Sequence, residues 1–266
     1  MATYSPQHIA TILGVPHRGV LGDFPISYLL IDSRKLVFPS ATLFFAIKSA
    51  TGDGHAFIQE LYQAGVRNFI VSVLPPLEEY PEACFFLVTN VVYALQQLGA
   101  YHRSQFEYPV IAITGSNGKT IVKEWLNHLL HKKYQIVRSP RSFNSQLGVP
   151  LSIWGMNDEH NLAIFEAGIS REGEMHSLQQ IIRPTIGLIT NIGEAHSDGF
   201  TSMSVKLKEK LLLFKGVDVL VYCKDHEWID NQVGRLISAQ TLDSRYVWSR
   251  TSPLANVFLY KIEQLQ

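Results

Sequence analysis

A short loop in the middle of the chain combines two glycines, a lysine and a threonine in an order typical of phosphate binding. The loop consists of Gly115, Ser116, Asn117, Gly118, Lys119 and Thr120. Backbone N–H groups of such a loop point toward one spot, and a helix that starts behind them adds partial positive charge. Lys119 supplies a full positive charge, and the Thr120 hydroxyl suits Mg²⁺ beside a phosphate. The loop therefore predicts a phosphate site.

The spacing of this loop is shorter than the strict phosphate-loop pattern. G-x-x-x-x-G-K-[ST] needs a glycine where this chain has Ile113, so the loop is the G-x-x-G-K-T form from Gly115 to Thr120. The alternative is a glycine turn with a surface lysine. The phosphate interpretation is favoured because an apolar, strand-like run precedes the loop and apolar residues follow it with helical spacing. Those residues are Ile121, Val122, Trp125, Leu126, Leu129 and Leu130.

Two other polar groups follow apolar runs further along the chain. Glu166 follows one run directly, and His196 lies shortly after the next. In parallel sheets the ligand sits outside the carboxyl ends of the strands, so both side chains are expected on the edge that carries Lys119. Mg²⁺ prefers oxygen ligands and keeps several waters, which suits Thr120 and Glu166. A lone histidine after a strand is more often structural, so His196 is the less typical ligand.

These residues require an α/β framework in the second part of the chain. From residue 110 onward, apolar runs of strand length alternate with helical patterns. This alternation predicts a largely parallel sheet that is covered on both faces. The strands are expected at Val110–Thr114, Tyr134–Val137, Leu162–Phe165, Ile186–Thr190, Val217–Tyr222 and around Arg245–Trp248.

Residues 1–106 show a separate, smaller α/β pattern. Strands are expected at Ile26–Ile31, Thr42–Ile47, Asn68–Val73 and Cys84–Val88, and helices at His55–Ala64 and Val91–Arg103. Pro109 then interrupts the pattern, because the residue before a proline is pushed out of helical geometry. We therefore expect two domains, at 1–106 and 107–266.

Two polar segments of the first domain are candidate anion contacts. Ser33 and Arg34 directly follow an apolar strand, and His55 lies at the start of a helix. An arginine at a strand end, with hydroxyl and helix-start donors nearby, could hold a phosphate. Ordinary turn chemistry is the alternative, and these residues by themselves favour it.

Composition limits the classes of function. The 266 residues suggest about two domains, and Lys plus Arg equals Asp plus Glu at 23 each. Without a basic excess, nucleic acid is not an expected partner. Cys84 and Cys223 lie in apolar runs and are expected to be core thiols in a reducing compartment. No apolar stretch reaches the roughly 20 residues of a membrane span and no signal pattern opens the chain, so we expect a cytoplasmic protein.

Several motifs together resemble the Mur ligases of peptidoglycan synthesis. The matching segments are Thr114–Thr120, Lys123-Glu124, Phe143–Leu151, Glu166–Gly168, Gly173–Met175 and Asn191–His196, with Asp32–Arg34, Leu43–Ala46 and Asp53–His55 in the first domain. The resemblance extends to about residue 222 and is strongest to the branch that joins D-alanyl-D-alanine to a UDP-N-acetylmuramoyl-tripeptide. Ser145-Gln146 stands where the family often has Asn-Glu, and Ala167 where Met is commoner; both departures are mild.

The resemblance implies an ATP- and Mg²⁺-dependent ligase with a UDP-substrate domain in front of a P-loop-type ATPase domain. In that reaction ATP phosphorylates the carboxylate of the UDP-linked peptide, and the amine of D-alanyl-D-alanine attacks the acyl phosphate. The resemblance implies metal-binding roles for Thr120, Glu166, His196 and Lys210, catalytic roles for Lys119, His196 and Lys210, and substrate binding by Ser33, Arg34, His55 and Asn144.

Lys210 is a residue for which the sequence allows two interpretations. It lies fourteen residues after His196 and matches a lysine that the family carries as a carbamate, a group that turns an ammonium into an anion. The alternative is a solvated helix face, because Lys206, Lys208 and Lys215 flank it.

The resemblance also predicts more chain than is present. Mur ligases have three domains, and Gln266 falls inside the second, so we expect the adenine contacts and the C-terminal domain to belong to a longer parent, conceivably fused to an enzyme such as an alanine racemase. Two alternatives stay open. One is a folylpolyglutamate-type ligase, which shares the short loop, and the other is a non-catalytic module that binds nucleotide or UDP-peptide.

Overall fold

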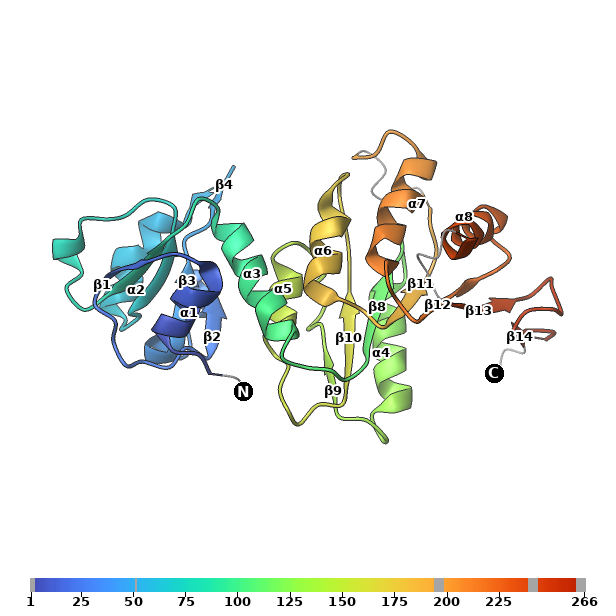
Figure 1. Ribbon diagram of the computed structural model, residues 1–266, viewed down its shortest axis with the longest axis horizontal. Coiled ribbons are helices and arrows are strands. Elements are labelled where there is room, and N and C mark those ends of the chain that lie inside the picture. Colours follow the sequence, from blue (N-terminus) through green and yellow to red (C-terminus); the bar gives the residue numbers. More distant parts are fainter. Residues whose placement is uncertain (1–2, 51, 194–198, 239–243, 262–266) are drawn as a thin grey trace. The chain divides into compact units, whose positions relative to one another are not determined.

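The computed structural model describes residues 3–50, 52–193, 199–238 and 244–261 (Figure 1). The chain divides into two compact units. The first is Met1–Gln105 with Trp154–Asn157, and the second is Phe106–Ile153 with Asp158–Gln266. The division falls close to the expected boundary between residues 106 and 107, but the short segment around Trp154 was not expected in the first unit.

The first unit is built on a five-stranded sheet in the order β1-β7-β6-β3-β2. The strands are β1 (His17–Gly19), β2 (Tyr28–Leu30), β3 (Thr42–Phe45), β6 (Asn68–Val71) and β7 (Cys84–Leu87), and the helices are α1 (Pro6–Leu13), α2 (Ile58–Gln63) and α3 (Val91–Arg103). The pairs β2·β3, β3·β6 and β6·β7 are parallel, and β1 is antiparallel to β7. Phe44, Phe69 and Phe85 form the centre of the core on one face.

Trp154 explains why its segment belongs to the first unit. Its ring lies 5.0 Å from that of Tyr4 and 4.9 Å from that of His102, measured between centroids. The indole Nε1 donates to the Ser27 carbonyl at 2.9 Å, and a His102 nitrogen lies 3.0 Å from the Met156 carbonyl oxygen. A buried indole needs such a partner for its N–H, and the first unit provides it.

The second unit is built on a seven-stranded sheet in the order β14-β13-β12-β11-β8-β10-β9, in which every described pair is parallel. The strands are β8 (Val110–Thr114), β9 (Ile136–Arg138), β10 (Leu162–Glu166), β11 (Ile186–Ile189), β12 (Val219–Cys223), β13 (Ser244–Ser249) and β14 (Val257–Phe258). The helices are α4 (Lys119–Leu130), α5 (Gly148–Ile153), α6 (Glu174–Ile182), α7 (Met203–Leu211) and α8 (Glu227–Ser238). The predicted α/β class with a mainly parallel sheet is confirmed.

Helix α4 covers only part of one face of this sheet. Val122, Leu126 and Leu130 pack on a cluster that includes Ile113. The sheet register continues this row from Ile113 through Leu188 and Val221 to Tyr246. Exposure rises along the row, from 0% at Ile113 to 47% at Tyr246.

The neighbouring positions on the opposite face stay buried, as Leu220, Tyr222 and Val247 show. We expected a sheet covered on both faces. Among the described residues, the sheet face on which α4 packs is only partly covered at strands β11, β12 and β13, so that expectation holds only in part.

Candidate active site

The phosphate loop lies between β8 and α4, and its two glycines meet different requirements. A Cβ on Gly115 would lie 1.9 Å from Thr190 Oγ1, so the residue directly after β11 leaves no room for a side chain here. Gly118 has a φ of 79° at the N-cap of α4, a backbone conformation that favours glycine. This cap carries no side-chain hydrogen bond, so the first amides of α4 are available to an anion.

The loop is joined to the segment that follows β11, because β8 and β11 are neighbours and end at the same edge of the sheet. The Ser116 N–H donates to the Asn191 carbonyl at 2.8 Å, and the Asn117 N–H donates to Asn191 Oδ1 at 3.0 Å. Thr190 Oγ1 donates to the Asn117 carbonyl at 2.6 Å. We expected the loop amides to point at a phosphate. The amides of Ser116 and Asn117 instead donate to Asn191 in the neighbouring segment.

Glu166 ends β10 on the other side of β8 and is fully buried. Its Oε2 accepts a hydrogen bond from Thr120 Oγ1 at 3.0 Å and one from Asn144 Nδ2 at 3.4 Å. The sequence predicted that Thr120, Glu166 and Asn144 serve one site, and the structure brings them together.

Lys123 is a residue of this site for which sequence reasoning gave no role. Its side chain is 0% exposed, and its ammonium lies 2.9 Å from Glu166 Oε1. It also donates to the carbonyls of Ser139, at 2.8 Å, and Arg141, and pairs with Glu124 Oε1 at 3.2 Å. The available signal was its position one helical turn after Lys119, on the same face of α4.

Three lysines gather at the loop. Lys119 Nζ donates to the Gly115 carbonyl at 2.8 Å, and Lys210 Nζ, from α7, donates to the same carbonyl at 3.3 Å. Lys206 Nζ, one turn earlier on α7, donates to the Gly193 carbonyl at 2.7 Å. Lys210 and Lys206 are buried, so neither belongs to a solvated face, whereas Lys208 and Lys215 are exposed.

Burial lowers the pKa of all three lysines. For Lys210 the pKa falls from 10.5 to about 7, because burial removes water from the ammonium and the charges of Lys119 and Lys206 repel it. For Lys119 burial is again the largest cause; the charge of Glu166 opposes it and that of Lys206 adds to it. For Lys206 the cause is burial. A bound anion would favour the charged forms of these lysines.

The lowered pKa of Lys210 predicts how stability depends on pH. Above its folded pKa of about 7 and below 10.5, the folded chain keeps this amine neutral while the unfolded chain protonates it. The unfolded state then binds more protons, so the free energy of unfolding should rise with pH, by up to about 1.4 kcal/mol per pH unit for such a group. Lys210→Met should flatten that slope in urea titrations in CO₂-free buffer. An unchanged slope, or equal flattening by Lys208→Met, would contradict the assignment.

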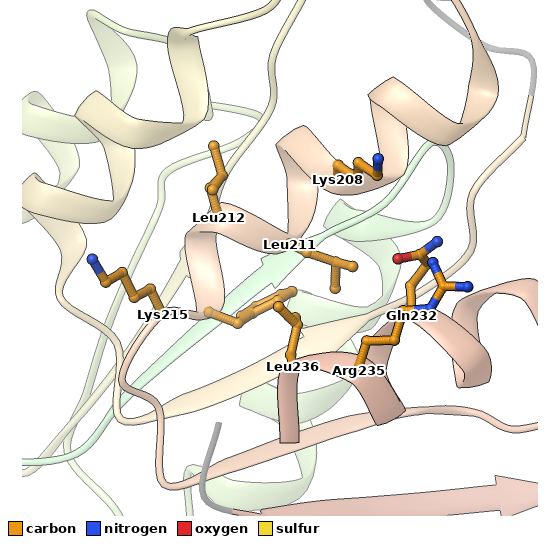
Figure 2. Close-up of a pocket in the computed structure, with 8 residues that line it drawn as sticks. Lys208, Leu211, Leu212, Lys215, Gln232, Arg235 and Leu236 are labelled. Carbon is orange, nitrogen blue, oxygen red and sulfur yellow. The ribbon is translucent and has the colours of Figure 1, made fainter. Parts of the chain in front are cut away.

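A cavity of about 420 Å³ lies between the C-terminal part of α7, the segment 212–215 that follows it, and α8 (Figure 2). It is lined by Lys208, Leu211, Leu212, Phe214, Lys215, Gln232, Arg235 and Leu236. Its lining shares no residue with the loop site, and of the α7 lysines it includes Lys208 but neither Lys206 nor Lys210.

The donor atoms of the predicted metal site are a carboxylate and a hydroxyl. Glu166 Oε1 is buried and, among the described residues, accepts no hydrogen bond, since Lys123 faces it as an ion pair outside hydrogen-bond geometry. One carboxylate and the Thr120 hydroxyl fit Mg²⁺, which keeps several waters. No group of three or more His, Cys, Asp or Glu side chains gathers in the part of the chain that the structure describes. His196 lies outside the described residues.

The candidate residues of the first unit follow the carboxyl ends of its parallel strands. Ser33 and Arg34 lie in a short 3₁₀ helix after β2, where Arg34 donates to both carboxylate oxygens of Asp32 at 2.8 and 2.9 Å. The Arg34 side chain is otherwise 87% exposed. Its guanidinium is thus held in place and open to solvent, as an anion contact would require.

His55 is occupied on both ring nitrogens. Its Nε2 accepts the Ser72 N–H at 3.1 Å, so the proton lies on Nδ1 and is donated to Asp53 Oδ1 at 2.6 Å. The ring therefore ties the turn before α2 to the end of β6. Its predicted substrate contact stays a prediction.

Comparison with known proteins assigns the family. The family model for the Mur ligase middle domain matches residues 113–246, which contain the loop, Glu166 and the α7 lysines. The chain belongs to the Mur ligase family.

Two similar proteins carry the same name. A UDP-N-acetylmuramoyl-tripeptide–D-alanyl-D-alanine ligase of Borreliella burgdorferi is 34% identical over 205 residues, covering 74% of this chain and 44% of that protein. The ligase of the same name from Escherichia coli is 29% identical over 238 residues, covering 88% and 49%. This chain spans about half the length of the Mur ligases it matches.

Solved structures agree with the fold. A crystal structure of MurF from Acinetobacter baumannii superposes with a TM-score of 0.86 at 26% identity, covering all of this chain and 56% of that one. MurF ligase from Thermotoga maritima, in complex with ADP, has a TM-score of 0.74 at 25% identity, covering 85% and 51%. The described helices of this Mur ligase chain include none that is long and apolar enough to cross a membrane.

Proposed function

We propose that this chain is the substrate-binding and nucleotide-activating part of an ATP-dependent ligase that joins D-alanyl-D-alanine to a UDP-N-acetylmuramoyl-tripeptide. The observation that carries the proposal is the meeting of the phosphate loop, Glu166 and the buried lysines at one sheet edge. The names of the similar ligases supply the substrates. The expected cytoplasmic location agrees with this role and stays a prediction.

The loop residues suit activation of a carboxylate by ATP. Phosphoryl transfer depends mostly on positioning and on neutralising charge. Lys119 would turn from the Gly115 carbonyl to the β- and γ-phosphates, and the uncapped amides at the start of α4 would donate to the same groups. Gly115 to Thr120 would thus hold the nucleotide.

Thr120 and Glu166 would hold the nucleotide-bound Mg²⁺, with His196 proposed as a ligand of a second ion and Lys210 as a further ligand. The ion would supply charge neutralisation at the transferred phosphoryl group. Within this chain, Lys123 contacts Glu166 Oε1 and Asn144 contacts Glu166 Oε2, so the carboxylate is held in one orientation without an ion.

Lys210 is the proposed carbamate. A neutral amine adds to CO₂ and releases a proton, giving a carbamate anion on the side chain. The pKa of about 7 keeps a substantial share of the amine neutral near neutral pH. The anion formed would replace one of three like charges at the loop with the opposite charge, which lowers the repulsion with Lys119 and Lys206.

The first unit is the proposed UDP-peptide site. Ser33 and Arg34 would contact the diphosphate, and His55 is a further proposed substrate contact of this unit. Asn144 is a proposed substrate contact of the second unit. The support is the exposed and oriented Arg34 guanidinium at the carboxyl edge of the sheet.

The proposal is tested by separating binding from turnover. The 266-residue chain should bind UDP-N-acetylmuramoyl-tripeptide in preference to folates, and bind ATP weakly. It should form no measurable amide with all three substrates and Mg²⁺, because holding the acceptor amine in line needs a complete site. A longer chain that continues beyond residue 266 should form the amide, measured by mass spectrometry. Failure of both chains to bind UDP-peptide, or turnover by the 266-residue chain, would contradict the proposal.

A further inference from the structure

Lys206 has a position that its neighbours in sequence do not share. Its side chain is 1% exposed, and its ammonium donates to the Gly193 carbonyl at 2.7 Å. The same carbonyl accepts a hydrogen bond from Ser116 Oγ at 3.0 Å, and the Gly193 N–H donates back to Ser116 Oγ at 2.9 Å. The backbone of one residue, Gly193, thus links α7 to the phosphate loop.

We infer that Lys206 is a positioning residue of the phosphate site: from α7 it holds the Gly193 carbonyl, and through Ser116 it keeps the loop in the arrangement that nucleotide binding needs. The inference rests on the proposed function, because it assigns Lys206 to the same nucleotide site. It gives Lys206 no contact with the nucleotide itself.

The first support is the cost of the arrangement. Burying an ammonium is unfavourable unless it is well hydrogen-bonded, and an apolar side chain of similar volume would fill the same space without that cost. The hydrogen bond to Gly193 is one interaction that such an apolar side chain could not make, and it acts on the backbone that follows β11.

The second support is that α7 contacts the loop at two points. Lys210, one turn after Lys206, donates to Gly115 at the start of the loop. Lys206 reaches Ser116 through Gly193. Asn191 binds the amides of Ser116 and Asn117 between these contacts. Loss of Lys206 should make the backbone at Gly193 more mobile and so weaken the hydrogen bonds between Gly193 and the Ser116 side chain.

The first test measures the loop without any ligand. Lys206→Met keeps an unbranched side chain, one atom shorter, and removes its charge and donors. Amide hydrogen exchange at Ser116, Asn117 and Gly193 should become roughly tenfold faster or more, because a hydrogen bond to a charged donor is lost. Lys208→Met, on the exposed side of the same helix, should leave these amides unchanged. Equal protection in both variants would overturn the inference.

The second test is a double-mutant cycle on ADP affinity. Lys206→Met and Ser116→Ala should each weaken ADP binding by roughly tenfold, and the double variant should bind about as weakly as either one. Coupling is expected because both changes interrupt one chain of hydrogen bonds. Additive losses, or a loss that disappears at high salt, would show a through-space charge effect and overturn the inference.

The outcomes also separate this inference from the proposed function. If the unaltered chain binds no nucleotide, the proposed function fails, while hydrogen exchange still decides whether Lys206 positions the loop. If the unaltered chain binds ADP and Lys206→Met binds it equally well, only the role of Lys206 is wrong.

Discussion

Lys119→Ala should weaken the affinity for ATP and ADP by roughly 100-fold while the fold stays intact. Charge-assisted hydrogen bonds to phosphates are worth about 1.5–3 kcal/mol each, and this ammonium would make more than one. The folded chain should lose little stability, because burial lowers the pKa of Lys119 and so disfavours the charged form of this side chain. Without nucleotide, its partners are the carbonyls of Gly115 and Ser116.

Calorimetric or fluorescence titration with ADP measures this effect, and thermal unfolding checks the fold. Lys208→Ala is the matched control, since it removes an exposed lysine of the same unit. Unchanged ADP affinity in a folded Lys119→Ala variant would remove the loop from the proposed nucleotide site.

Lys123→Ala should lower the free energy of unfolding by about 3–5 kcal/mol, the range for breaking a buried ion pair by removing one partner. The change leaves Glu166 buried without its cation and takes a donor from the Ser139 and Arg141 carbonyls. Urea denaturation at neutral pH measures the loss.

Glu124 provides the control for this prediction. It also pairs with Lys123, but its side chain is 44% exposed, so Glu124→Gln should cost less than about 1 kcal/mol. A double variant that removes both buried charges, Lys123→Met with Glu166→Gln, should be more stable than Lys123→Ala alone. Similar stability of Lys123→Ala and the unaltered chain would show that the buried pair contributes little.

The strands that position the site could be predicted because they are continuous apolar runs. β8 and β10 are buried along their whole length, which gives a strong sequence signal. The hairpin of β4 (Lys48–Ser49) and β5 (Gly52–Asp53) is exposed and short, so it offers no apolar pattern to detect. α1 was missed although Ser5 and Pro6 provide a helix start, because the segment is brief.

The site was predictable where chemistry follows a strand end. Lys119 and Thr120 were identified from the loop pattern and Glu166 from its place after a strand, and the structure joins Thr120 to Glu166 by a hydrogen bond. Lys123 and Lys206 were not identified, because a lysine in an amphipathic helix is normally solvated. Only their tertiary partners, a carboxylate and a backbone carbonyl, distinguish them from surface lysines.

The partly covered row from Ile113 to Tyr246 has a consequence for how the purified chain behaves. Solvent-exposed aromatic and branched side chains on a sheet face favour self-association. On the outer side of α4, Trp125 and Leu129 enlarge the exposed apolar surface, at 67% and 73% exposure. With 23 basic and 23 acidic residues, the chain has little net charge to oppose that attraction. Sulfate and similar salts strengthen apolar association, so precipitation thresholds should fall steeply as such salts are added.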